Sequence, residues 1–220
     1  MTSQPRVILF DLWMTLVYSL PVDPILSLQQ MLGYKTDGGR APQLDPLFLR
    51  ACLTTNIVDE AAFLKHIAGT LAVDVPEGAG ERFTALLQSE RAGVTRYPET
   101  DQVLTALKER GVRLGLVSNL WPFPVHHIFN HLGLGAHFEH LVYSFAVGAP
   151  KPEAAIFHDA CSRFGVSPQE CLMVGDSMGS DIAGAVGVNM PATLINRSGK
   201  PVSGLTAGVS QIASLQELLV

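Results

Sequence analysis

Polar side chains that could take part in catalysis follow four separate apolar runs of the sequence. These residues are Asp11, Thr15, Ser118, Asn119, Lys151, Asp176 and Asp181. In an open α/β sheet, ligands gather at the carboxyl ends of the strands. If the apolar runs are strands of one parallel sheet, these side chains meet at a single edge of it.

The chemistry of this set is that of an anion site with a metal. Asp11 and Asp176 at neighbouring strand ends repel each other unless a cation lies between them. Oxygen ligands of this kind suit Mg²⁺. Ser118, the Asn119 backbone and Lys151 could bind an anionic group opposite, as phosphoryl transfer requires. A lone Asp after a strand is more often a turn or helix cap, so the inference depends on the coincidence of all the positions.

The elements that must position these residues alternate between strand and helix. Short apolar runs rich in β-branched residues, typical of strands buried on both faces, occupy residues 7–10, 114–117, 171–174 and 192–195, with a weaker run at 141–145. Helical spacing of apolar residues is found at 100–110, 153–164 and 181–186. The alternation predicts an α/β fold with a doubly wound, Rossmann-like parallel sheet.

Residues 17–95 have a different pattern. They contain no convincing strand and four helical patterns, at 25–32, 47–53, 59–71 and 81–92. We therefore expect a core domain formed by residues 1–16 and 96–220, with a small helical cap domain, residues 17–95, inserted after the first strand.

The composition of the chain indicates which kinds of binding partner to expect. The 220 residues are 47% hydrophobic and 16% charged, with a net charge of −5 and no run of Lys or Arg. A nucleic-acid partner is not expected, because it would need a basic stripe. Neither a signal peptide nor a membrane span is indicated, and the three cysteines suggest no disulfide framework. We expect a cytoplasmic protein, a monomer or homodimer, acting on a small molecule.

The order of the motifs resembles that of the haloacid dehalogenase superfamily of hydrolases over nearly the full chain. The first family motif, Asp-x-Asp-x-Thr, reads Asp11-Leu-Trp-Met-Thr15 here. The second is LGLVSNL, and the third is Lys151-Pro152. The fourth, Gly-Asp-Ser followed by a further Asp, reads VGDSMGSD. The helical insertion resembles the family's C1-type cap, which closes over the site and selects substrates.

The resemblance implies a role for each residue. Asp11 would be the nucleophile that forms an aspartyl intermediate. Thr15, Ser118, Asn119 and Lys151 would hold the transferring group, an anionic phosphate ester in the phosphatases of this family. The implied Mg²⁺ ligands are Asp11, the backbone carbonyl of Trp13, Asp176 and Asp181, the last completing or supporting the metal site.

Trp13 departs from the family pattern. Phosphatases of the family usually have a second Asp there, which protonates the leaving alcohol and then activates water. An indole provides only an N–H donor. Three hypotheses follow: a phosphohydrolase that obtains the proton from substrate or solvent, a 2-haloacid dehalogenase that needs no such proton, or a binding or regulatory protein that has lost turnover.

The fourth motif favours phosphate chemistry. The dehalogenase branch needs no metal and has Ser-x-Asn-x-x-Asp, whereas this chain keeps Asp176 and Asp181 in the metal-binding form. The dehalogenases also place a halide-binding Arg on an early cap helix. Neither Arg40, in a glycine-rich loop, nor Arg50 has a matching context.

Other conspicuous residues have simpler interpretations. His126, His127 and His131 fall on one predicted helix without a zinc signature, so solvated histidines are favoured. Trp121 and Phe123 either line the substrate pocket or pack a proline-rich loop. Arg197, after the last predicted strand, is predicted to be a surface residue rather than a substrate contact.

Overall fold

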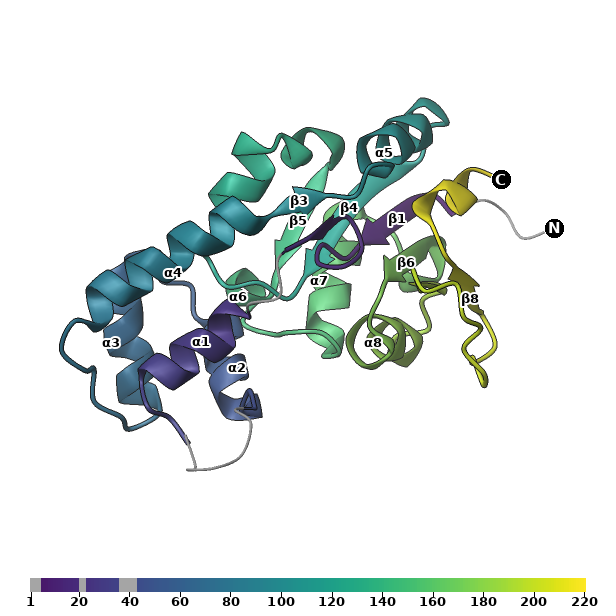
Figure 1. Cartoon of the computed structure of the whole chain (residues 1–220). Coiled ribbons are helices and arrows are strands. Elements are labelled where there is room, and N and C mark those ends of the chain that lie inside the picture. The colour runs from purple at the N-terminus through teal and green to yellow at the C-terminus, as the bar shows by residue number, and fades with distance from the viewer. Residues whose placement is uncertain (1–4, 20–22, 36–42) are drawn as a thin grey trace.

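The computed structural model describes residues 5–19, 23–35 and 43–220. A parallel sheet has helices on both faces, and a separate group of helices lies to one side of it (Figure 1). The six strands are paired in the order β5-β4-β1-β6-β7-β8. They are β1 (Val7–Phe10), β4 (Arg113–Ser118), β5 (His140–Tyr143), β6 (Cys171–Gly175), β7 (Ala192–Ile195) and β8 (Val209–Ile212). This confirms the predicted α/β doubly wound fold.

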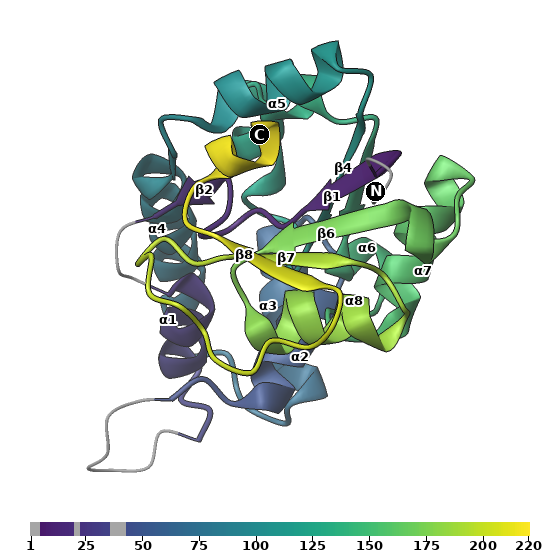
Figure 2. The ribbon, with the colours of Figure 1, turned by 90° about the vertical axis from the view of Figure 1, so that its right-hand side faces the viewer.

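The central strand β1 explains why the sheet is covered on both sides. Successive side chains of a strand point to opposite faces. Ile8 and Phe10 pack under α5 (Thr100–Glu109) on one face. Val7 and Leu9 pack on the other, with residues of α7 (Ala154–Phe164) and α8 (Ala183–Gly187). Figure 2 shows the sheet between these two layers.

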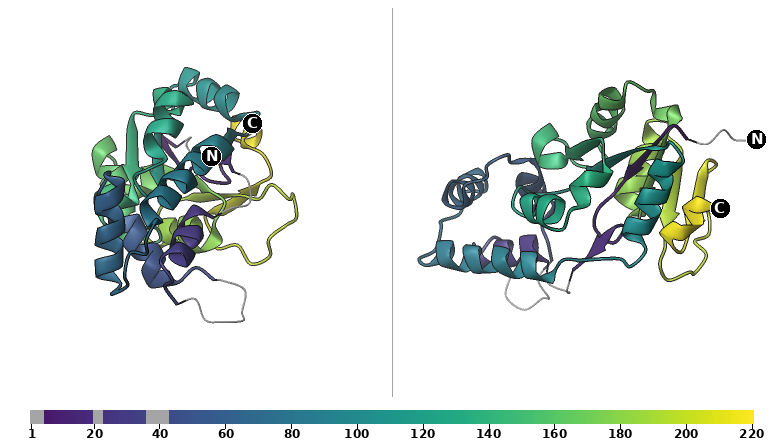
Figure 3. Two further views of the ribbon diagram at one scale, coloured as in Figure 1. Left: turned by 60° about the vertical axis from the view of Figure 1, so that its left-hand side comes forward. Right: turned by 90° about the horizontal axis from the view of Figure 1, so that it is seen from above.

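The inserted helices form their own apolar core. They are α1 (Pro24–Met31), α2 (Pro46–Thr54), α3 (Glu60–Thr70) and α4 (Ala79–Gly93). The first three begin at Asp23, Asp45 and Asp59, whose carboxylates accept hydrogen bonds from the first free backbone N–H groups. Figure 3 shows the four helices grouped beside the sheet.

Short helical segments complete the chain. They are α6 (Ser144–Val147), the π-helical turns η1 (His127–His131) and η4 (Met178–Ile182), and the 3₁₀ turns η2 (Leu134–His137), η3 (Pro168–Glu170) and η5 (Leu215–Leu219). None of the helices in the described ranges has the length and apolar character needed to cross a bilayer.

The inserted segment does contain strand, contrary to the prediction for residues 17–95. Val17 and Tyr18 (β2) pair with Thr95 and Arg96 (β3) in a two-stranded antiparallel sheet. Each strand has only two residues, so no alternating pattern exists for the sequence to reveal. The pairing joins the two ends of the insertion.

Two predicted elements have different bounds in the structure, and one further strand was not predicted. The predicted strand 141–145 is wrong at its end, because Tyr143 pairs with the last residue of β4 and Phe145 lies in α6. The predicted helix 181–186 starts as the π-helical turn η4, and α8 begins at Ala183. The edge strand β8 was not predicted, since its sequence VSQI lacks a continuous apolar run.

Candidate active site

Asp11 lies directly after β1 at the carboxyl end of the sheet, where its backbone N–H still bonds to the Val174 carbonyl at 2.9 Å. Its Oδ1 is 2.6 Å from the Nζ of Lys151. The Ser118 hydroxyl, at the end of β4, donates to the same oxygen at 3.3 Å. The structure therefore brings three of the predicted residues together around one carboxylate oxygen.

Lys151 is almost fully buried, with 4% of its surface exposed. Its ammonium donates to the Val117 carbonyl at 2.8 Å and lies 2.6 Å from Oδ1 of Asp181. A buried ammonium is tolerated when acceptors surround it. Although burial opposes its charge, Asp11 and Asp181 raise the pKa of Lys151 above its ordinary value.

Asn119 fixes the backbone of Lys151. Its Oδ1 accepts from the Lys151 N–H at 2.7 Å, and its Nδ2 donates to the Lys151 carbonyl at 3.0 Å. The sequence predicted a role for the Asn119 backbone, and the structure shows that its side chain also takes part in the site. The two bonds join the loop after β4 to the loop after α6.

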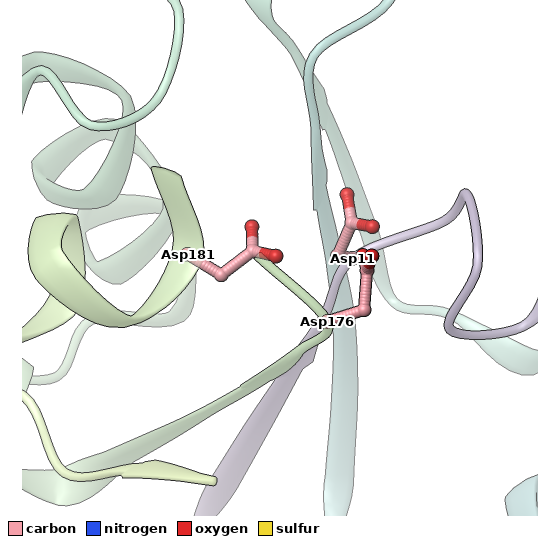
Figure 4. A group of neighbouring side chains, drawn as sticks. All are labelled: Asp11, Asp176 and Asp181. Carbon is pink, nitrogen blue, oxygen red and sulfur yellow. The ribbon is translucent and has the colours of Figure 1, made fainter. Parts of the chain in front are cut away.

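Three carboxylates meet beside this lysine. Oxygen atoms of Asp11, Asp176 and Asp181 all lie within 4.8 Å of one another, and in Figure 4 the three side chains converge from β1, β6 and η4. Asp181 is further oriented by the Ser177 N–H, which donates to its Oδ2 at 3.0 Å. A side chain at Gly175 would overlap the Asp181 carboxylate, which explains the glycine in this motif.

The proton affinities indicate unfavourable crowding of negative charge. Burial raises the pKa of Asp11 to about 7; Lys151 opposes the shift, and Asp181 and Asp176 add to it. Burial, followed by the charge of Asp181, raises the pKa of Asp176 to about 6. A divalent cation among these oxygens would relieve the repulsion, and an all-oxygen donor set of this kind fits Mg²⁺.

The remaining residues of the first motif occupy different environments. Thr15 is fully buried, and its hydroxyl has no hydrogen-bond partner among the described residues. Trp13 is partly buried and packs against the core under α5. Between them Met14 is half exposed and has the left-handed φ of 58°. The Trp13 side chain provides no acid or base to the site.

Arg197, which was predicted to lie at the surface, is only partly exposed. Its side chain is 22% exposed, and its guanidinium donates to backbone carbonyls of the loop after β1. Arg197 lies far along the chain from the first motif, and the residues around it form no motif. The sequence therefore did not predict this contact. Arg197 also borders an open cavity of about 290 Å³ beside Asp176 and Met14.

The two aromatic residues after Asn119 pack rather than line a pocket. Trp121 and Phe123 are buried in the core of the inserted helices, with ring centroids 6.0 and 4.9 Å from that of Phe63 on α3. The Trp121 Nε1 donates to the Glu90 carboxylate of α4 at 3.1 Å. Burial raises the pKa of Glu90 to about 7, and no sequence signal pointed to this residue.

The stacked histidines and Arg50 make contacts outside the carboxylate cluster. The rings of His127 and His131 stack at 5.0 Å. Over the described ranges, the one group of three or more His, Cys, Asp or Glu side chains placed to share an ion is the aspartate cluster. Arg50 of α2 pairs with Glu153, and Arg40 lies outside the described residues.

Comparison with known proteins agrees with the motifs. The family model described as haloacid dehalogenase-like hydrolase matches residues 5–189. The chain is 30% identical over 152 residues to a phosphoserine phosphatase of Thermus thermophilus, covering 68% of this chain and 61% of that relative, less than two thirds of its length. It is 29% identical over 163 residues to haloacetate dehalogenase H-2 of a Moraxella species, covering 73% and 70%.

A solved structure shows the same likeness in three dimensions. A HAD phosphatase from Thermococcus onnurineus superposes with a TM-score of 0.64 at 27% identity, covering 97% of this chain and 95% of that one. The match over 5–189 includes all four motif positions and the buried Asp11–Lys151 pair. The chain is a member of the haloacid dehalogenase-like hydrolase family.

Proposed function

We propose that this protein is a Mg²⁺-dependent phosphohydrolase of a small phosphorylated metabolite, working through an aspartyl-phosphate on Asp11. The observation that carries the proposal is the convergence of three carboxylates within 4.8 Å of one another beside a buried lysine. Without a cation, repulsion between the three carboxylates destabilises the folded protein. A reaction that needs no metal would not require such a cluster. The phosphatase relative supports the same reaction class.

Asp11 is the nucleophile in this proposal. Lys151 and Ser118 both bond to Oδ1, which leaves Oδ2 to attack phosphorus. The new O–P bond forms as the bond to the leaving oxygen breaks, and water later hydrolyses the aspartyl-phosphate. Lys151 offsets negative charge, and the unpaired hydroxyl of Thr15 donates to the phosphoryl oxygens.

The residues that would hold Mg²⁺ are Asp11, Asp176, the Trp13 carbonyl and Asp181. Asp181 also holds Lys151 and is itself oriented by the Ser177 N–H. When bound, the ion neutralises charge on the transferring group.

Trp13 shapes the substrate range. No carboxylate stands two residues after Asp11, so the leaving oxygen departs without a proton from this position. General acid catalysis typically contributes about 10²–10⁴-fold. Esters whose leaving group is a weak base depend least on that contribution. We therefore propose that such activated phosphate esters are turned over faster than esters of simple alcohols.

Replacement of Asp11 by Asn tests the proposal. Asn keeps the shape but cannot attack phosphorus, so Mg²⁺-dependent phosphate release from a panel of phosphate esters should fall by at least about 10³-fold. Asp159→Asn, which neutralises a partly exposed aspartate on α7 that pairs with Arg163, is the matched control and should keep wild-type rates. Equal rates for Asp11→Asn and wild type would exclude Asp11 as the nucleophile.

Dehalogenation of a 2-haloacid is the second candidate. The aromatic Trp13 and the haloacetate dehalogenase relative favour it. Halide release from chloro- and bromo-acids in the presence of EDTA would support this activity, and an absence of release would exclude it. Tight Mg²⁺ and phosphate-analogue binding without either reaction would instead indicate a binding or regulatory protein.

A further inference from the structure

Arg197 contacts the loop that follows the nucleophile from the opposite end of the sequence. It lies just after β7, yet its Nη2 donates to the Thr15 carbonyl at 2.7 Å. Its Nε donates to the Met14 carbonyl at 3.3 Å. One side chain therefore holds two consecutive peptide groups of the first motif.

The same guanidinium is held from two further sides. Its Nη1 donates to the Glu99 carboxylate at 2.7 Å, and its Cζ lies 3.3 Å from the centroid of the Tyr97 ring. Glu99 and Tyr97 belong to the segment by which the chain returns from the inserted helices. A planar guanidinium can make in-plane hydrogen bonds and stack on a ring at the same time, which an ammonium cannot do.

The loop needs such support. Met14 has a left-handed φ of 58°, a conformation unfavourable for a residue with a Cβ. The next residue, Thr15, has a fully buried hydroxyl without a partner among the described residues. Because Arg197 holds the Thr15 carbonyl, it restrains the backbone that carries this hydroxyl.

We propose that Arg197 is a positioning residue, whose guanidinium fixes the Met14–Thr15 backbone so that the Thr15 hydroxyl is presented to the phosphoryl group on Asp11. The identity of that ligand rests on the proposed function. The effect on the loop does not, so the two can be tested separately.

Hydrogen exchange of the backbone amides of residues 12–17 measures the loop directly. Arg197→Ala and Arg197→Lys should both accelerate this exchange, by about tenfold or more, because neither restores the planar contacts. The matched control is Arg110→Ala, which removes another arginine bonded to a backbone carbonyl, that of Leu219 at 2.7 Å. It should leave exchange at 12–17 unchanged. If Arg197→Ala does not fold, the lysine variant decides.

Kinetics separate positioning from general stability. Small misplacements of a catalytic group can cost about 10²-fold in rate, so kcat per folded molecule should fall by about 10–10² in both Arg197 variants, with a smaller change in KM. Unchanged exchange at 12–17 would overturn the proposal. So would a lowered Tm with wild-type kcat in the folded fraction, which is the result of a merely structural role. If the wild-type protein releases no phosphate, the proposed function fails. The effect of Arg197 on the loop is then tested by hydrogen exchange at residues 12–17 alone.

Discussion

The indole two residues after Asp11 determines how the leaving group can depart. Trp13 is partly buried against the core under α5, so its ring contributes packing instead of proton transfer. The rest of the motif set surrounds Asp11 with Lys151 and Ser118 at hydrogen-bond distance. The chain thus keeps groups for binding and attack, and it lacks the usual acid and base.

Replacing Trp13 by Asp should raise phosphatase activity. A carboxyl at this position can protonate the leaving oxygen, for which we expect a gain of about 10²-fold in phosphate release. Trp13→Asn is the control, since it has the same size as Asp and loses the same packing but transfers no proton. Initial rates on an alkyl phosphate, together with the Tm of each variant, provide the measurement. Equal rates for the Asp and Asn variants would contradict the expected role.

Glu90 should make stability depend on pH. Its folded-state pKa is raised to about 7 by burial, so the folded protein keeps this proton at pH values where the unfolded chain has already released it. Stability from this group is therefore full at low pH and falls as pH rises from its ordinary pKa towards about 7. Relative to Glu90→Gln, wild type should lose about 1–2 kcal/mol between about pH 5 and pH 7.5.

Urea unfolding of both proteins at the two pH values measures this difference, because groups common to both cancel. Glu81→Gln, on the exposed side of the same helix, controls for the loss of one carboxylate. Parallel pH profiles for wild type and Glu90→Gln would show that the Glu90 proton is not linked to folding.

The inserted helices owe their boundaries to local sequence. Asp23, Asp45 and Asp59 stand at the N-caps of α1, α2 and α3, and prolines follow the first two at the first helical position. These capping signals can be recognised in the sequence alone. The ends of all four inserted helices were predicted to within three residues of those in the structure. Element-scale stability can be tested at one of these caps.

Asp59→Ala should destabilise α3 by about 1 kcal/mol, since the Ala62 N–H loses its acceptor at 2.8 Å. Asp59→Asn is the matched control and should retain most of the stability, because an amide oxygen can cap the helix. Denaturant unfolding compares the three proteins. An alanine variant as stable as the asparagine variant would show that this bond contributes nothing.

At the scale of the whole molecule, the loop after β4 links the sheet to the core of the inserted helices. Trp121 and Phe123 come from the loop after β4 and are buried among the aromatic rings of α3 and α4. An Arg50–Glu153 ion pair joins α2 to the start of α7, and β2 and β3 join the two ends of the insertion. Moving the insertion away from the sheet would expose these rings.

Mg²⁺ should stabilise the whole fold. A ligand that binds only the folded state adds about 2.7 kcal/mol at one hundred times its Kd. We expect Mg²⁺ to raise the Tm and EDTA to reverse the change. Asp176→Asn should abolish the shift, and without metal this variant should be more stable than wild type, since one of the crowded charges is removed. The control is Asp159→Asn; a wild-type shift in Asp176→Asn would argue against the site.

The sequence by itself determined the fold class and most of the candidate site. Continuous apolar runs identified the buried strands, and the polar residue after each run identified Asp11, Ser118, Lys151 and Asp176, because parallel strands end at one edge. The order of these residues also carried the family resemblance. The apolar runs and the motif residues that follow them are short stretches of sequence, so both can be recognised without the structure.

Only the tertiary structure decided the contacts between distant segments. The two-residue strands β2 and β3 exist through pairing across the insertion, and the edge strand β8 through its neighbour β7. Arg197 reaches the Thr15 carbonyl and Trp121 reaches Glu90 with no pattern in either segment. Such pairings depend on where the fold brings two segments together, because hydrogen bonding and burial act over distances in space rather than along the chain.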